Sequence, residues 1–437
     1  MLKDSRFGLL LALLFAGSMW FYVQEVLIPR QKADAAAHGR PRGNLSDLYP
    51  RWLGARELLL HHRDPYSAET TREIQQGFYG RQLDPAKPAE PSDQAAFAYP
   101  VYVVFLLAPT VRAEFPQVVA IARWLFLFGI AVSVPLWRGA VGFRVKAEWV
   151  VCAMVLALSS YPSMLEFYMQ NLSAVVAVFL ALASIAAVRE WLALSGFLLA
   201  LSTIKPQLSI FFVLWFLLWT TGQWRERKRL ALSFLLTLMA LVLGGEALLP
   251  GWLAEFLTAI RKYRHYTSSP SGLRMFFPPA IAWSLAALLV GTVIGFGWKR
   301  RRHSAVSNEF GWMLGWVAAV SVVMVPIALY NQLLLIPALL ALLSQRQLIW
   351  KSGLVPRALT KATFACLGWQ WIMAAALGLA SLVLPLQRLQ RAAHVPVYTA
   401  LALPMITLLA LAAIPGMARL RMGRSQQAAV RPGSTVV

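Results

Sequence analysis

The dominant feature of this sequence is a succession of apolar runs, many of them long enough to cross a membrane. A helix needs roughly 17–25 apolar residues to cross about 30 Å of hydrocarbon, and runs of this order recur along the whole chain. A helix of a soluble protein would carry a single apolar stripe. Charged residues make up 14% of the 437 residues, against about 25% in soluble domains. The sequence therefore predicts an all-α polytopic membrane protein.

The basic loops indicate how often the chain crosses the membrane. Lys and Arg concentrate in cytoplasmic loops, which holds here if the N-terminus is inside and the run 97–110 does not cross. That run is short and bounded by prolines, which suits a re-entrant helix. We therefore predict about 12 transmembrane helices with both termini in the cytoplasm. The predicted spans are approximately 7–28, 117–137, 149–165, 171–188, 191–204, 207–221, 230–249, 276–297, 310–327, 330–345, 362–385 and 397–415.

The net charge of +22 has the same origin as this loop pattern. Basic loops meet anionic headgroups, so membrane lipids, and not nucleic acid, are the expected partners. The two cysteines, Cys152 and Cys366, lie inside apolar runs and match neither a metal-binding nor a disulfide pattern.

The longest hydrophilic stretch, residues 29–96, is predicted to lie outside the cytoplasm. An amphipathic helix is expected from Pro50, which suits a first helical position, to about His62. It would lie in the membrane interface, with Trp52, Leu53, Leu59 and Leu60 facing the lipid. The predicted regions are 1–28 as the first transmembrane helix, 29–96 as the extracytoplasmic loop, 97–418 as the multi-helix bundle and 419–437 as a cytoplasmic basic tail.

Polar residues that a set of apolar helices does not need converge on the extracytoplasmic face of this topology. This convergence predicts a site there, in a protein of the cell inner (plasma) membrane. Glu166 and the loop 261–274 are placed on the same face. The candidate substrate-binding residues are Asp64, Tyr66, Tyr99, Gln170, Asn171, Gln207, Tyr330 and Asn331.

Several basic residues on this face could bind a phosphate. Lys205 precedes a proline between two apolar runs; it either snorkels at a helix end or is a phosphate ligand. Arg261, Arg264 and His265 oppose the positive-inside trend, and an arginine fork suits phosphate oxygens. These four residues are the candidate phosphate ligands.

Asp47 is the candidate general base, because the transfer of a group to a hydroxyl needs a neighbouring residue that accepts the hydroxyl proton. Two readings stay open, since Asp47 could also cap the helix that begins near Pro50. Asp64, followed by Pro65, could likewise be a turn residue only. No His, Cys or paired carboxylates have the spacing of a metal site, and no cofactor is expected.

An ordered series of short motifs resembles a known family. The series begins with Asp47-Leu-Tyr and Arg63-Asp-Pro-Tyr, continues with Tyr99-Pro and Gln170-Asn, and ends with Thr203-Ile-Lys-Pro and Tyr330-Asn-Gln. It resembles the GT-C glycosyltransferases of the polyprenol-phosphate-mannose-dependent type (glycosyltransferase family 87). The resemblance implies a GT-C-like bundle, a polyprenyl-phosphate-linked sugar donor, a lipid or glycan acceptor and an inverting displacement with Asp47 as base. A multi-pass transporter and a lipid-linked oligosaccharide ligase or polymerase are the alternatives.

Overall fold

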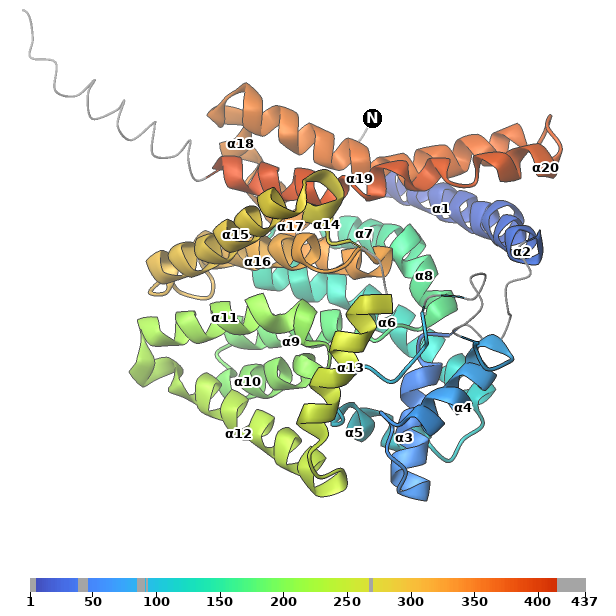
Figure 1. Cartoon of the computed structure of the whole chain (residues 1–437). Coiled ribbons are helices and arrows are strands. Elements are labelled where there is room, and N and C mark those ends of the chain that lie inside the picture. Colours follow the sequence, from blue (N-terminus) through green and yellow to red (C-terminus); the bar gives the residue numbers. More distant parts are fainter. Residues whose placement is uncertain (1–4, 38–45, 85–90, 92, 267–269, 415–437) are drawn as a thin grey trace, which may run out of the picture.

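The computed structural model describes residues 5–37, 46–84, 91, 93–266 and 270–414 (Figure 1). This part of the chain consists of helices and loops and contains no strand, only an isolated bridge between Ser271 and Pro326. The prediction of an all-α membrane protein is confirmed at this level. The basic tail predicted at 419–437 lies outside the described residues.

Long apolar helices make up most of the described chain. Six segments are long and apolar enough to cross a membrane, and two bent helix pairs raise that number to eight. The six are Ser5–Ala37, α6 (Phe115–Val141), α12 (Trp224–Leu248), α15 (Pro279–Arg300), α19 (Leu354–Ala380) and Leu386–Ile414. The bent pairs are α7 (Ala147–Ser159) with α8 (Tyr161–Met169), and Leu329–Ser344, which includes α17 (Ile336–Ser344), with α18 (Arg346–Ser352). Shorter apolar helices are α9 (Ser173–Val188), Leu192–Ile204, which begins with α10 (Leu192–Leu201), α11 (Pro206–Gly222) and α16 (Asn308–Met324).

The first helix is longer than predicted. The apolar run ends near residue 28, but α1 (Ser5–Phe21), a π-helical stretch (Tyr22–Leu27) and α2 (Ile28–Ala37) form one continuous segment. Its last ten residues contain four alanines together with Gln, Lys and Arg, which are good helix formers even where they are polar. The end of an apolar run is therefore not the end of the helix here.

The helix predicted from Pro50 to about His62 is present as α3 (Tyr49–His61), with Pro50 in its first turn. The prediction that Trp52 faces the lipid is wrong. Trp52 is buried, its indole donates to the Thr110 carbonyl at 3.1 Å, and its ring lies 5.0 Å from that of Phe115. The indole N–H can find a carbonyl inside the protein but not in hydrocarbon.

The run 97–110 contains only α5 (Val103–Leu107) and a 3-10 turn (Ala108–Thr110), so it is too short to cross the membrane, as predicted. The segment 261–274, expected as a loop, belongs largely to α13 (Trp252–Tyr266) and α14 (Gly272–Phe276). The remaining elements are α4 (Ala68–Tyr79), α20 (Leu386–Leu389) and 3-10 turns at Gln390–Ala392 and Val395–Ala400.

The core of the bundle lies around α16, which is buried on every side from Phe310 to Val323. A helix that is apolar all round belongs inside a bundle. Close packing next to the core depends on Gly196 of α10, where a Cβ atom would lie 2.2 Å from the Leu230 carbonyl oxygen of α12. Small residues allow helix backbones to approach in this way.

The basic loops lie together at one end of the bundle. Arg227 donates to the carbonyl of Arg301 at 2.7 Å and to that of His303 at 3.0 Å, which joins the α11–α12 connection to the α15–α16 loop. The Arg346 guanidinium lies 6.0 Å from the Phe143 ring, which links α18 to the α6–α7 loop. In Figure 1 the α11–α12 connection, the α15–α16 loop and α18 lie at the left, whereas α3, α4 and α8 lie at the right.

Candidate active site

Asp47 lies in the turn before α3, and its carboxylate points to the α8–α9 turn. Its Oδ2 accepts a hydrogen bond from Asn171 Nδ2 at 2.7 Å, across 124 residues of sequence. The Asp47 backbone N–H also donates to the Met169 carbonyl at 2.7 Å. The N-cap of α3 is Leu48, and no side chain caps this helix. The capping interpretation of Asp47 is therefore wrong.

Gln170 shapes the turn that presents Asn171. Its φ of 46° is left-handed and reverses the chain after α8. Gln170 is fully buried, and its amide oxygen accepts from Ser46 Oγ at 2.7 Å. Two turns far apart in sequence are thus fastened together, so that Asp47 faces Asn171.

Lys205 lies at the break between the 3-10 turn Ser202–Ile204 and α11. Only 5% of the residue is exposed, and its ammonium donates to Asn171 Oδ1 at 2.8 Å. It also contacts Ser173 Oγ and, at 3.4 Å, Asn331 Oδ1. Its Nζ lies 5.0 Å from the centre of the Tyr330 ring. The structure therefore brings together Asp47, Asn171, Lys205, Tyr330 and Asn331, which we call the polar cluster.

Arg51, in the first turn of α3, joins this cluster and was missed by the sequence analysis. Its Nη1 donates to the Asp47 carbonyl at 2.8 Å, and its guanidinium lies 4.6 Å from the centre of the Tyr99 ring. Burial opposes its charge, but Tyr99 and Asp47 raise the pKa of the guanidinium, so Arg51 stays charged. A signal was available, because a cation is unfavourable at the positive end of a helix.

The Tyr99 ring lies against the Arg51 guanidinium, and Tyr66 in turn holds Tyr99. The Tyr66 hydroxyl donates to the Tyr99 carbonyl at 2.6 Å. Burial raises the pKa of Tyr99 to about 12, although the Arg51 charge acts in the opposite sense, and burial also raises the pKa of Tyr66. Both phenols thus stay protonated at neutral pH. Asp64 forms the predicted turn, accepting from the Tyr66 N–H at 2.8 Å.

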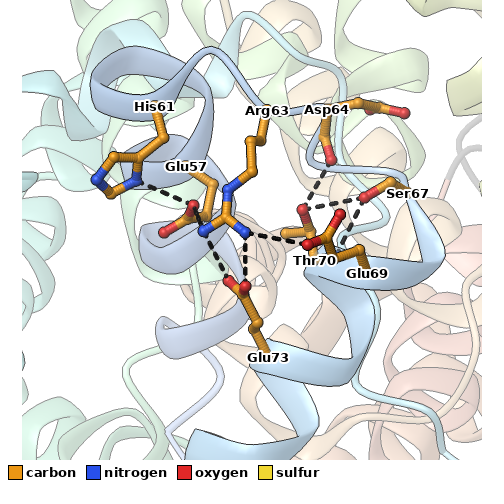
Figure 2. A network of polar contacts seen from close by, with 8 residues as sticks. All are labelled: Glu57, His61, Arg63, Asp64, Ser67, Glu69, Thr70 and Glu73. Carbon is orange, nitrogen blue, oxygen red and sulfur yellow. Dashed lines mark hydrogen bonds and ion pairs between the residues drawn. The ribbon is translucent and has the colours of Figure 1, made fainter.

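An ion-pair network holds this turn between α3 and α4 (Figure 2). Arg63 contacts the carboxylates of Glu57 and Glu73, the latter at 2.6 Å. Glu57 is buried and also lies 3.0 Å from His61. These contacts fix the start of α4 beside α3, and with it the Asp64–Tyr66 turn.

Comparison with known proteins gives the family of the chain. The model of glycosyltransferase family 87 matches residues 97–347, more than half of the chain. The chain belongs to glycosyltransferase family 87. No curated protein and no solved structure matches it. The resemblance inferred from the motifs is confirmed, and membership favours a membrane glycosyltransferase, with a sugar donor and an acceptor, over a transporter.

Other predicted residues of this family 87 protein lie outside the polar cluster. Gln207 is exposed in the first turn of α11. Arg261 and Arg264 are exposed on α13. His265 belongs to the same helix, but its side chain lies outside the described residues. Their suggested roles remain predictions.

Metal ligands do not gather in the described residues, where no group of three or more His, Cys, Asp or Glu could hold an ion. With Arg51 added, the polar cluster comprises one carboxylate, two cations, one phenol and two amides. This set suits proton transfer next to a group that carries negative charge.

Proposed function

We propose that this family 87 glycosyltransferase moves a hexose, mannose, from a polyprenyl-phosphate-linked donor to a lipid or glycan acceptor. The reaction takes place at the extracytoplasmic face of the plasma membrane and needs no metal or cofactor. The Asp47 carboxylate carries this proposal. Asn171 holds its Oδ2, while Oδ1 accepts no hydrogen bond from any described residue. A carboxylate with one oxygen fixed and the other available suits a general base.

The proposed reaction is a single displacement. The acceptor hydroxyl gives its proton to Asp47 Oδ1 as its oxygen attacks the anomeric carbon. The bond from that carbon to the phosphate oxygen breaks, and polyprenyl phosphate leaves with the electron pair. Since attack and departure occur on opposite faces, the anomeric configuration is inverted. Negative charge grows on the phosphate in the transition state, where fixed cations stabilise it.

The donor class can be tested with purified protein in liposomes. We expect radiolabelled mannose to pass to a lipid or glycan acceptor from polyprenyl-phosphate mannose and not from GDP-mannose. Transfer from GDP-mannose alone would refute the donor class. Transfer only of preassembled glycans from a polyprenyl diphosphate would favour the ligase alternative.

A twelve-span topology is part of the proposal. Each predicted span corresponds to one of the six long segments, the two bent pairs or the four shorter apolar helices. The 16 residues of α9 cover roughly 24 Å at 1.5 Å per residue, which local bilayer thinning can accommodate. The contacts between basic loops support a cytoplasmic end at Arg227 and Arg301.

Cysteine labelling tests this arrangement. Gln76 on α4 and Ser304 in the α15–α16 loop are both exposed. In a variant whose Cys152 and Cys366 are replaced by Ala, we expect Gln76→Cys to react from the extracytoplasmic side and Ser304→Cys from the cytoplasmic side. Labelling of both from the same side would contradict the topology.

A further inference from the structure

The N–H groups of Lys205 are already in use. An ammonium group has three donors, and the three nearest oxygens belong to Asn171, Ser173 and Asn331. The residue is 5% exposed. A phosphate could bind Lys205 only by displacing one of these oxygens, at the cost of leaving it buried without a partner.

Carboxyl groups also interact electrostatically with Lys205. Glu166 on α8 is 0% exposed, and neither carboxylate oxygen has a hydrogen-bond partner among the described residues. The backbone amides of Asn171 and Ala174 approach this carboxylate without reaching hydrogen-bond geometry, and its strongest attraction to another charged side chain is to Lys205. Lys205 therefore has a buried carboxyl group nearby as well as three oxygen partners, and its contact with Asn171 serves to position the amide that binds Asp47.

Arg51 differs from Lys205 in the number of N–H donors that remain unused. A guanidinium has five N–H donors, and in the described chain only Nη1 of Arg51 is used, toward the Asp47 carbonyl. Its Nε is buried without a partner. None of the ion pairs among the described residues includes Arg51. Because the residue is only partly buried while its Nε is enclosed, a ligand would reach the Nη groups.

The surroundings of Arg51 also favour an anion. It lies at the positive end of α3, a helix of 13 residues, which attracts negative charge. Its contact with the Asp47 backbone places it next to the candidate base, and the Tyr99 ring holds the guanidinium plane. An arginine fork with free donors matches two oxygens of one phosphate.

We propose that Arg51 binds the phosphate of the polyprenyl donor, an inference that rests on the proposed function. Lys205 then contributes indirectly, because its hydrogen bond to Asn171 holds that amide in place. Arg51 then holds the phosphate as it leaves the anomeric carbon, while the proton of the acceptor hydroxyl moves to Asp47.

The test compares binding of farnesyl phosphate with that of farnesol, by thermophoresis of the full-length protein in detergent. Wild type is expected to bind the phosphate more tightly than the alcohol. In Arg51→Gln, the ratio of the dissociation constants for the alcohol and the phosphate should fall at least about tenfold. The variant loses hydrogen bonds between a charged guanidinium and the phosphate. Arg51→Lys should retain part of it, since it keeps the charge without the fork. Arg56→Gln is the matched control, because Arg56 lies on the same helix and stacks over Trp52.

Each outcome separates this inference from the proposed function. Wild type without a preference for the phosphate would overturn both. A wild-type preference that persists in Arg51→Gln would overturn only the role of Arg51, and loss of it in Lys205→Met alone would assign the phosphate to Lys205. Short-chain phosphatidic acid competing as well as farnesyl phosphate would assign Arg51 to phospholipid headgroups. Arg51→Lys keeps the test decisive if Arg51→Gln does not fold.

Discussion

Asp47→Asn is expected to lower turnover by about 10²–10⁴-fold, the usual contribution of a general base. The substitution keeps the size of the side chain, and the amide oxygen of Asn can still accept the hydrogen bond that Asn171 donates at 2.7 Å. It removes the group that takes the acceptor proton. The measurement is steady-state transfer from polyprenyl-phosphate mannose at saturating donor.

Stability and donor binding should change little in Asp47→Asn, because Asp47 does not cap α3. Glu114→Gln is the matched control, since Glu114 is an exposed carboxylate at the start of α6 whose side chain makes no capping hydrogen bond. An Asp47→Asn enzyme with near wild-type turnover would end the assignment of Asp47 as base. Asp64 and Glu166 would then be the carboxylates to test.

Asn171→Asp should reduce turnover at pH 7 by about 10²-fold, toward the lower end of what a general base contributes. Two carboxylates at hydrogen-bond distance cannot both ionise, so the pair retains a proton and its upper pKa rises. A retained proton leaves Asp47 unable to accept one from the substrate. Activity should recover as the pH rises through that higher pKa, and the acidic limb of the pH–rate profile should move to higher pH.

The control for this charge effect is Asn171→Leu, which removes the hydrogen bond to Asp47 without adding a carboxylate. Its rate should fall, and its acidic limb should move much less than that of Asn171→Asp, because it loses one hydrogen bond but gains no like charge. A wild-type pH profile in Asn171→Asp would show that Asp47 does not act as the base. Thermal unfolding of both variants checks that the α8–α9 turn is intact.

The helical membrane class and the order of the helices could be predicted from the sequence, because each depends on local composition. The length of an apolar run, which decides whether it can cross the hydrocarbon, does not depend on the rest of the chain. Proline positions likewise located the break at Lys205 and the start of α3. The family resemblance also rested on short local motifs.

The direction of individual side chains could not be predicted in this way. Trp52 was expected to face lipid but donates to Thr110, which is 58 residues away. Asp47 was an equally good helix cap on local sequence, and only the α8–α9 turn shows that its carboxylate is held elsewhere. Arg51 was not distinguished from the many other basic residues of the sequence.

Sequence alone therefore determined that this chain lies in a membrane, and it identified most of the residues that meet in the polar cluster. Tertiary structure decided what those residues do to one another. Lys205 looked like a free cation between two apolar runs, yet its donors are occupied by Asn171, Ser173 and Asn331. The physical reason is that burial in hydrocarbon acts on each segment separately, whereas a hydrogen bond depends on the mutual placement of two groups within about 3 Å.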